Sequence, residues 1–192
     1  DFTTQKVMEL KLRRENERLR SSFKDRYRFG EMIGESRAMQ KVYELTLKAA
    51  ATDTNVIVYG ESGTGKELVA QAIHNLSDRS AGPFVPVNCG AISENLLESE
   101  FFGHVRGAFT GADRENKGYL DAAHTGTLFL DELGEISLPL QVKLLRVLDG
   151  RGYSPVGSTK IKKSDVRIIA ATNRNLKESV INGKIRQHFF YR

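Results

Sequence analysis

Residues 55–67 read NVIVYGESGTGKE, and this stretch decides the fold. Its first five residues form a short, β-branched run that is typical of a buried parallel strand. A glycine-rich turn follows, and residues 66–75 then have the composition of a helix. A strand that leads through a glycine-rich loop into a helix is the setting that a phosphate-binding loop requires.

The chemistry of this loop suits a nucleoside triphosphate. Its glycines allow several backbone N–H groups to converge on the phosphates, and the N-terminus of the following helix adds a favourable dipole. Lys66 can reach the β- and γ-phosphate oxygens as a compact cation. The predicted ATP-binding residues of the loop are Gly60, Glu61, Ser62, Gly63, Thr64, Gly65, Lys66 and Glu67. Glu67 departs from the motif, which has Ser or Thr there to place a hydroxyl on Mg²⁺.

Three further apolar runs predict strands along the chain. They are PFVPVNC at 83–89, TLFLD at 127–131 and VRIIAAT at 166–172. Helical patterns at 36–51, with Ser36 as its cap, and at 138–148 lie among them. Repeated strand and helix units of this length predict an α/β fold with an open, mostly parallel sheet and helices on both faces. The expected architecture is a three-layer αβα core of the P-loop NTPase kind.

Two adjacent carboxylates, Asp131 and Glu132, end one of these runs. A buried parallel strand delivers its last residues to the carboxyl edge of the sheet, where ligands bind in open α/β folds. Asp131 is predicted to hold Mg²⁺, directly or through water, and Glu132 to polarise the water that attacks the γ-phosphate. Acidic pairs at strand ends also occur as turn-forming surface residues, but the phosphate loop favours the catalytic interpretation.

Polar amides end two other strands. Asn173 can orient water or contact the γ-phosphate, although a simple strand-terminating role is the alternative. Asn88 is predicted to hydrogen-bond Glu132 and is counted with the catalytic residues. Ile33 and Gly34, in a predicted loop over 28–35, complete the expected ATP-binding set.

Composition sets limits on other functions. The net charge of +5 could suggest nucleic acid, but much of the excess alternates with Glu in residues 6–28, as on a solvated helix face. Direct DNA binding by this chain is therefore not predicted. Residues 1–28 are predicted to form a linker helix, either a dimerising coiled coil or a helix lying on the domain, and residues 29–192 the domain itself.

Cysteine and apolar patterning limit the chain further. Cys89 is the only cysteine, so no disulfide framework is expected, and it is predicted to be a small core residue. The histidines lack metal-site spacing and are expected to be structural or surface groups. No apolar run approaches the ~20 residues that cross a bilayer, and no leader is recognised, so no membrane partner and a cytoplasmic location are expected.

Four strings in order carry a resemblance to a known family. They are GESGTGKE (60–67), ESEFFGHVRGAFTGA (98–112), GTLFLDELGEI (126–136) and IIAATNRNL (168–176). Together they resemble the central domain of the NtrC-type sigma-54-dependent transcriptional activators, a branch of the AAA+ ATPases. The similarity runs from about Phe29 to Arg192, and GAFTGA is its most specific element.

The resemblance implies a partner. In the family, GAFTGA tips a loop that contacts the sigma-54 subunit of RNA polymerase when ATP is bound. The residues that this assigns to sigma-54 contact are Gly107, Ala108, Phe109, Thr110, Gly111 and Ala112. From the residues alone, a mobile surface loop is the interpretation. A second loop, residues 152–165, is similar to the family segment that supports the first, and its lysines at 160, 162 and 163 are taken as solvated charges.

The resemblance also implies a subunit ring, a hexamer or heptamer when active and a dimer when held off. ATP lies between subunits in the family, and an arginine from the neighbour completes the site. By motif the candidates are Arg186 and Arg192, although Gln187 and His188 stand where the family usually has acidic residues. A helical lid and usually a DNA-binding domain follow in the family. Without the lid, weak nucleotide binding and slow hydrolysis are expected.

The predicted function is therefore that of an ATPase with ATP and Mg²⁺ as cofactors. Hydrolysis in the ring would drive the GAFTGA loop to remodel the closed promoter complex of the sigma-54 RNA polymerase holoenzyme. Two alternatives remain at this point. One is another AAA+ remodelling ATPase, against which GAFTGA argues, and the other is a nucleotide-responsive binding module without turnover.

Overall fold

The computed structural model describes residues 28–192. The predicted linker helix, with its coiled-coil alternative, lies outside these residues except for the last position of its range. Contacts divide the chain into two compact units, with the boundary between Thr46 and Leu47. The boundary expected at residues 28–29, between linker and domain, stays a prediction.

The first unit contains a short hairpin where a loop was predicted. Strands β1 (Arg28–Phe29) and β2 (Met32–Ile33) pair antiparallel, with Phe29 opposite Met32. Gly30 has φ 61°, which a two-residue hairpin turn requires and glycine adopts without strain. The Phe29 ring stacks on Tyr43 with the ring centroids 5.1 Å apart. The predicted loop at 28–35 was wrong in this respect, because two-residue strands are too short to show a sequence period.

Helix α2 (Arg37–Ala50) begins at the predicted cap. The Ser36 hydroxyl accepts a hydrogen bond from the Met39 amide at 3.2 Å, which satisfies one of the free N–H groups of the first turn. The predicted helix over 36–51 is thus confirmed to within a residue at each end.

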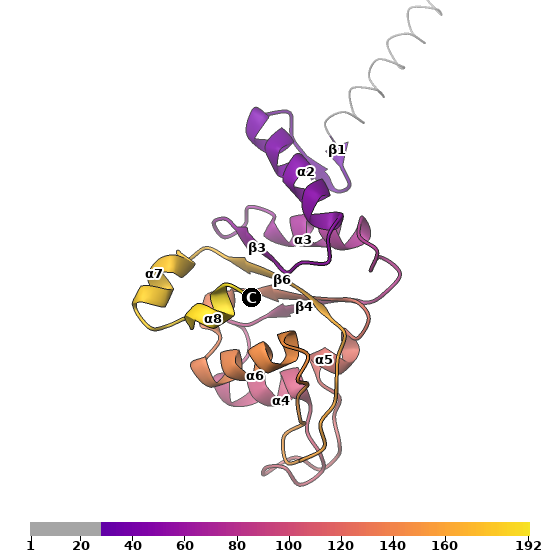
Figure 1. The fold of residues 1–192 in the computed structure, drawn as a ribbon, viewed down its shortest axis with the longest axis vertical. Coiled ribbons are helices and arrows are strands. Elements are labelled where there is room, and N and C mark those ends of the chain that lie inside the picture. The colour runs from indigo at the N-terminus through magenta and orange to yellow at the C-terminus, as the bar shows by residue number, and fades with distance from the viewer. Residues whose placement is uncertain (1–27) are drawn as a thin grey trace, which may run out of the picture. The chain divides into compact units, whose positions relative to one another are not determined.

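The second unit is built on a four-stranded parallel sheet. Its strands are β3 (Val56–Tyr59), β4 (Phe84–Asn88), β5 (Thr127–Asp131) and β6 (Arg167–Thr172), in the order β3-β6-β5-β4. All three strand pairs are parallel, so the four carboxyl ends share one edge (Figure 1). Pro86 lies in β4, an edge strand, where its missing N–H breaks no ladder bond within the sheet.

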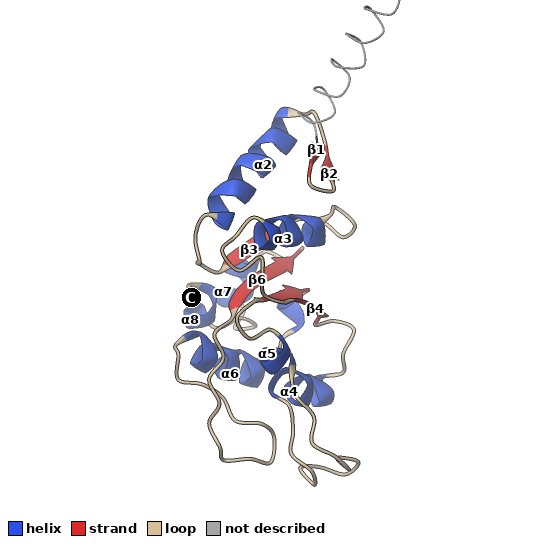
Figure 2. Ribbon diagram, turned by 90° about the vertical axis from the view of Figure 1, so that its right-hand side faces the viewer, coloured by secondary structure: helices blue, strands red, loops and turns tan. Residues whose placement is uncertain are grey.

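Helices cover both faces of this sheet, as Figures 1 and 2 show. Helix α3 (Lys66–Asn75) packs on one face through Ala70 and Ile73, against Phe129 of β5. The opposite face packs Leu128 and Leu130 into the larger core. That core is formed with α4 (Glu94–Phe102), α5 (Tyr119–Ala122), the 3-10 turn η1 (Leu133–Glu135), α6 (Leu138–Leu148), α7 (Leu176–Ile181) and α8 (Gln187–Phe190).

The side chains of β5 point alternately to the two helical layers that cover the sheet. Successive side chains of a strand point to opposite faces, so a strand buried on both faces is apolar throughout. Residues 127–130 of β5 are all buried, and all six residues of β6 are buried as well. The predicted three-layer α/β architecture with a parallel sheet is therefore confirmed.

The amino edge of the sheet carries an ion-pair network. Arg79 donates to both carboxylate oxygens of Asp53, which precedes β3, at 2.6 and 2.7 Å. It also donates to Asp165, which precedes β6, at 2.7 Å. The hydrogen bond from Arg79 holds the pKa of the Asp53 carboxyl below its usual value. These charges hold the connections before two strands to the end of α3.

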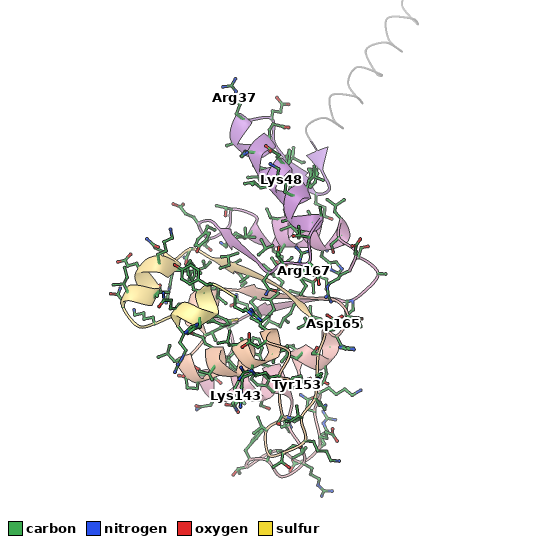
Figure 3. All side chains as sticks on the ribbon, viewed as in Figure 1. Arg37, Lys48, Lys143, Tyr153, Asp165 and Arg167 are labelled. Atoms are coloured by element: carbon green, nitrogen blue, oxygen red, sulfur yellow. The ribbon has the colours of Figure 1, made fainter. Side chains whose placement is uncertain are left out.

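Arg167, the first residue of β6, lies buried beside this network (Figure 3). Its guanidinium donates to the carbonyl oxygens of Thr54, at 3.1 Å, and Ala49, at 2.7 Å. The Ala49 carbonyl belongs to the last turn of α2, where backbone acceptors lack helical partners. Arg167 therefore satisfies buried backbone carbonyls at the end of α2 and before β3.

Within residues 28–192, no helix has the length and apolar character needed to cross a bilayer.

Candidate nucleotide-binding site

The loop between β3 and α3 has the backbone that glycine allows. Gly63 and Gly65 have φ values of 77° and 87°, in the left-handed region that other residues rarely enter. The Gly60 amide donates to the carbonyl of Thr172 at 3.2 Å, which fixes the start of the loop to the end of β6. The sequence thus places a rigidly anchored loop at the carboxyl edge of the sheet.

Lys66 points back into this loop. Its ammonium donates to the carbonyl oxygens of Gly60, at 3.0 Å, and Glu61, at 2.7 Å. The Thr64 hydroxyl donates to the same Glu61 carbonyl at 2.8 Å. A Cβ atom on Gly60 would lie 2.7 Å from the Thr64 hydroxyl oxygen, so the close turn needs glycine there. The lysine charge is thereby held where the loop amides converge.

A cavity of about 330 Å³ opens beside the loop. Its lining joins the phosphate loop to the ends of β5 and β6, as the sequence predicted. The lining residues are Ser62, Gly63, Gly65, Lys66, Glu67, Leu68, Asp131, Glu132 and Asn173. Leu68 is an addition, an apolar contact from the first turn of α3 that the motif does not mark. Ile33 and Gly34 lie in the first unit, so their assignment to ATP stays a prediction.

The two carboxylates at the end of β5 differ in conformation. Asp131 is the last strand residue, and its side chain accepts a hydrogen bond from the Glu132 amide at 2.9 Å. Glu132 has φ 56° and ψ 46°, a left-handed conformation that costs a non-glycine residue of the order of 1 kcal/mol or more. Within residues 28–192 neither carboxylate has an ion-pair partner. Strain and an unpaired charge in one cavity are typical of a functional site.

Asn88 does not make the hydrogen bond that the sequence predicted. Its side-chain oxygen accepts from the amides of Gly90, at 2.9 Å, and Ala91, at 3.1 Å, and among the described residues its side-chain nitrogen does not donate to the Glu132 carboxylate. An asparagine at a strand end readily caps the turn that follows, and these amides are the nearest donors. The predicted bond to Glu132 is wrong for this structure.

Gly90 is a site residue that the sequence did not reveal. A Cβ atom there would lie 1.9 Å from the carboxylate oxygen Oε2 of Glu132 and 3.4 Å from the side-chain oxygen of Asn88. The Glu132 carboxylate can hold its present position only while residue 90 has no side chain. A glycine directly after a strand that ends in Asn88-Cys89 was the available signal.

Arg174 links the ends of β5 and β6. Its guanidinium donates to the Gly134 carbonyl at 3.2 Å and forms an ion pair with the Glu135 carboxylate. It follows Asn173 directly, and Glu135 belongs to the turn that begins at Glu132. No sequence pattern indicates this contact, which holds together the two strand ends that line the cavity.

Cys89 is a buried core residue, as predicted. Burial, with a smaller contribution from Asp131 and Glu132, raises the pKa of its thiol to about 12. Its amide donates to the Asp131 carbonyl at 3.0 Å and extends the pairing of β4 with β5. A neutral, buried thiol is a poor nucleophile, so Cys89 has a structural role.

The two predicted arginines lie away from the cavity of their own chain. Arg186 is the N-cap residue of α8 and is exposed, and its guanidinium has no hydrogen-bond or ion-pair partner within the part of the chain that the structure describes. Arg192 pairs with Asp149, with 2.9 Å between Nε and Oδ1. Neither arginine lines the cavity around Lys66.

The GAFTGA segment forms a tight turn at the tip of a long loop. The Gly107 amide donates to the Ala112 carbonyl at 2.8 Å, and the Ala112 amide donates to the Phe109 carbonyl at 3.0 Å. Phe109 is 39% exposed and its ring lies edge-on to His104, with the centroids 5.0 Å apart. Ala112 is buried at 4% exposure, so its side chain belongs to the base of the turn.

The second loop runs beside the first, and both extend beyond helices α4 and α6 (Figures 1 and 2). The Val105 amide donates to the Val156 carbonyl at 3.1 Å, and the Val156 amide donates to Gly103 at 2.9 Å. A Cβ atom on Gly157 would lie 2.8 Å from Cβ of Ala108. The second loop therefore contacts the first along its length, from Gly103 to Ala108 of the GAFTGA turn, in keeping with the supporting role that the resemblance implied.

One lysine of the second loop is not simply solvated. Lys162 forms an ion pair with Asp121 at 3.2 Å, and its backbone pairs with Tyr153. The expectation that all three loop lysines are solvated charges was wrong for Lys162, because the loop folds back onto α5. Lys160 and Lys163 are exposed.

The residues of the cavity fit a magnesium nucleotide. Within residues 28–192 no group of three or more His, Cys, Asp and Glu side chains is placed to hold a metal ion. Mg²⁺ does not need such a cage, because it usually binds one or two carboxylates together with substrate phosphates and waters. Asp131 and Glu132 supply the carboxylates, and the loop with Lys66 supplies the donors for phosphates.

A glycine-rich loop with a terminal lysine, set between a parallel strand and a helix and facing two carboxylates, defines a P-loop NTPase fold. Comparison with known proteins gives the family. The family model described as "Sigma-54 interaction domain" matches residues 32–192. The chain therefore belongs to the sigma-54 interaction domain family of AAA+ proteins.

Individual relatives agree with this assignment. The Nif-specific regulatory protein of Herbaspirillum seropedicae is 50% identical over 181 residues, which are 94% of this chain and 33% of the relative. The putative uric acid sigma-54-dependent transcriptional regulator UacR of Escherichia coli K12 is 51% identical over 163 residues, which are 84% of this chain and 28% of the relative. The chain spans about a third of the length of the curated relatives it matches.

A solved structure shows the same fold. The crystal structure of NtrX from Brucella abortus in complex with ATP matches with a TM-score of 0.75 and 40% identity, over 94% of this chain and 39% of that one.

Proposed function

We propose that this chain is the ATP-hydrolysing domain of a sigma-54-dependent transcription activator. The observation that carries the proposal is the cavity that gathers Lys66, Asp131, Glu132 and Asn173 from three different elements. Each residue type has a role in cleaving a phosphoanhydride bond, and the relatives include a regulator named as sigma-54-dependent.

The roles follow from position and charge. Lys66, with the loop amides, binds the β- and γ-phosphates. Asp131 would hold Mg²⁺, and the ion would supply positive charge to the phosphate oxygens. Glu132 polarises the attacking water, and its lack of a cation partner within residues 28–192 leaves its carboxylate available for this. Asn173, at the end of β6, orients that water or contacts the γ-phosphate.

A neighbouring subunit completes the site in this proposal. Arg186 is exposed and unpaired within the described residues, and it does not reach the cavity of its own chain. In a ring, its guanidinium stabilises charge on the γ-phosphate held by the next subunit, an effect worth about 10³- to 10⁵-fold in rate. Arg192 is the second candidate. The ring is a hexamer or heptamer when active, and the predicted linker helix supports a dimer when it is not.

In this proposal the GAFTGA loop transmits the nucleotide state of the site to sigma-54. Phe109 is a half-exposed aromatic side chain between glycines, a combination that suits an anchor on a loop that must change shape. We propose that nucleotide state sets the position of this loop and that it contacts the sigma-54 subunit of the RNA polymerase holoenzyme. Coupled hydrolysis then remodels the closed promoter complex.

The test measures binding and turnover separately. Titration calorimetry should detect Mg²⁺-dependent ATP binding by the full-length protein, and the Lys66→Ala variant should lose it. Phosphate release should fall about 10²- to 10⁴-fold in Glu132→Gln while ATP affinity is kept, because a general-base role affects only the chemical step. Equal release by wild type and Glu132→Gln would leave Glu132 without a catalytic role.

One observation favours a second function. Glu67 lines the cavity where the P-loop motif places a hydroxyl on Mg²⁺. A nucleotide-responsive binding module without turnover would bind ATP, lose binding in Lys66→Ala and release no phosphate. The same two measurements therefore separate the module from the ATPase.

A further inference from the structure

A glutamine side chain inside helix α6 is fully buried and fully hydrogen-bonded. Gln141 has 0% exposure. Its Nε2 donates to the carbonyls of Ile136 and Lys184, both at 2.9 Å, and its Oε1 accepts from the Arg186 amide at 2.9 Å. A glutamine amide has two N–H donors and one oxygen acceptor, and here the nitrogen and the oxygen both find backbone partners.

The first of these groups belongs to the catalytic turn. Ile136 directly follows η1, the turn that starts at Glu132. The Glu135 amide donates to the Glu132 carbonyl at 2.9 Å, and the Ile136 amide donates to Leu133 at 3.3 Å. Leu133 and Ile136 are buried, at 4% and 3% exposure. The carbonyl that Gln141 binds is thus a rigid continuation of the residue that faces the nucleotide cavity.

The other groups belong to the segment that presents Arg186. The Lys184 carbonyl and the Arg186 amide both contact Gln141, and Ile185 between them is buried at 2% exposure. The amides of Lys184 and Ile185 also donate to the Ser179 carbonyl. The backbone of Arg186 is therefore fixed, while its guanidinium is free of partners in the described chain.

The far end of α6 holds the second arginine. Asp149, the C-cap residue of α6, forms the ion pair with Arg192. Helix α6 thus starts beside the Glu132 turn and carries one tether to each arginine. The Gln141 tether is buried and acts on backbone, whereas the Asp149 tether acts on an exposed side chain.

We propose that Gln141 is a positioning residue that links the catalytic turn of its own subunit to the arginine which that subunit offers to its neighbour. The inference rests on the proposed function, in which Arg186 acts on the nucleotide of the next subunit. Through this amide, a displacement at Glu132 is passed to Arg186 without a contact between the two residues. Each nucleotide site then influences the next site around the ring.

Two variants of the full-length protein test the hydrogen bonds of Gln141. Gln141→Met keeps the length and volume of the side chain but removes all three hydrogen bonds. Gln141→Glu keeps an acceptor for the Arg186 amide and loses the donors to Ile136 and Lys184. We expect Gln141→Met to lower kcat by about 10- to 100-fold, because small misplacements of a catalytic group have effects of this size. KM for ATP should stay within about twofold, since the residue does not line the cavity. Because Gln141→Glu sets a buried acceptor against two carbonyl oxygens, it should lower kcat at least as far as Gln141→Met.

A mixing experiment tests whether the defect acts on the neighbour. Lys66→Ala subunits bind ATP poorly but carry an intact Arg186, and Gln141→Met subunits bind ATP but misplace their Arg186. Mixed rings should release phosphate faster than the sum of the two parent preparations, because some interfaces regain both parts. The same mixture made with Arg186→Ala in place of Gln141→Met is the positive control.

The outcomes are distinct. If the Arg186→Ala control does not complement Lys66→Ala, the proposed role of Arg186 in a neighbouring site fails. If that control complements but Gln141→Met does not, Gln141 serves only its own subunit and the coupling role is overturned. A thermal melt and a fluorescent-nucleotide titration of each variant report folding, and a variant that binds nucleotide normally yet raises KM more than it lowers kcat also overturns the proposal.

Discussion

The two edges of the same parallel sheet use charge in opposite ways. At the amino edge, Arg79 binds Asp53 and Asp165, and every one of these charges has a partner. At the carboxyl edge, Asp131 and Glu132 share a cavity with no cation paired to them within residues 28–192. Charges that satisfy one another stabilise the fold, whereas carboxylates left unpaired in a cavity await a ligand. The comparison separates the charged residues that stabilise this domain from those that we propose act on a ligand.

Replacing one cation at each edge should give the largest difference between effects on ATP affinity and effects on stability. Lys66→Ala should weaken ATP binding about 100-fold, because a charge-assisted contact with phosphate is lost, and leave the unfolding temperature unchanged. Arg79→Ala should do the reverse and lower the free energy of unfolding by about 1–2 kcal/mol, with ATP affinity kept. Calorimetric titration and thermal denaturation measure the two effects. Equal effects of both variants on ATP affinity would contradict the division between the edges.

Two glycines provide a matched test of the same division. Gly90→Ala at the carboxyl edge places Cβ against the Glu132 carboxylate, the flexible end of a side chain, which can move aside. We expect kcat to fall by about tenfold or more with little change in stability. Gly82→Ala at the amino edge places Cβ 2.6 Å from the backbone carbonyl of Thr125, which cannot move aside.

The Gly82→Ala control should therefore destabilise the fold by about 1–3 kcal/mol and spare kcat at temperatures where the protein is folded. Phosphate release at saturating ATP and denaturant titrations distinguish the two variants. A stable, fully active Gly90→Ala protein would show that the Glu132 carboxylate does not need its present position.

Some elements of the fold could be predicted from the sequence and others could not. Strands β3 to β6 and helices α3 and α6 follow from β-branched runs and apolar periodicity, which are local properties of sequence. The P-loop and the Asp131–Glu132 pair follow from motifs in that frame. The β1–β2 hairpin was missed because it depends on Gly30 and on stacking of Phe29 against Tyr43.

Contacts between distant residues were beyond local patterns. The Asn88 bond to Glu132 was predicted from strand ends alone, but the turn after β4 offers closer donors. Arg174 and Gly90 shape the site through residues about 40 positions away in the chain. No composition or spacing reveals such pairs, since they arise only when the sheet brings its strand ends together.

A smaller effect, on the pH dependence of stability, should come from the buried thiol next to the carboxylates. Burial raises the pKa of Cys89 from 9.0 to about 12. Above pH 9 the unfolded thiol ionises while the native one stays neutral, so the unfolded state is favoured as pH rises. The free energy of unfolding should fall by about 1 kcal/mol per pH unit between pH 9 and 11 through this group.

Comparison of wild type with Cys89→Ala in urea titrations isolates this contribution. The native thiol should also react with a disulfide reagent at pH 8 far more slowly than the thiol of the denatured protein. Fast native labelling would place Cys89 at the cavity surface instead of beneath it.

The smallest expected effect lies at the amino edge. The hydrogen bond from Arg79 lowers the pKa of Asp53 below its ordinary value of 3.8. Its contribution is therefore present above that pH and is lost as the pH falls through the native pKa. Because the Asp53 side chain is 65% exposed, solvent screening keeps the effect below about 1 kcal/mol. Asp53→Asn should flatten the acid limb of a stability curve, and an unchanged limb would show that the pair contributes nothing.

The close approach of Gly157 to Ala108 has a consequence for sequence change in this domain. Gly157 has φ 79°, and a side chain there would meet Ala108. Neither bulk nor an ordinary dihedral is tolerated where the two loops touch. Residues 159–161 of the second loop are exposed, so inserted peptides or affinity tags should be accepted after residue 158 but not at 157. The second loop can be lengthened by engineering or by evolution beyond residue 158, while the contact between Gly157 and Ala108 keeps the two loops at a fixed distance.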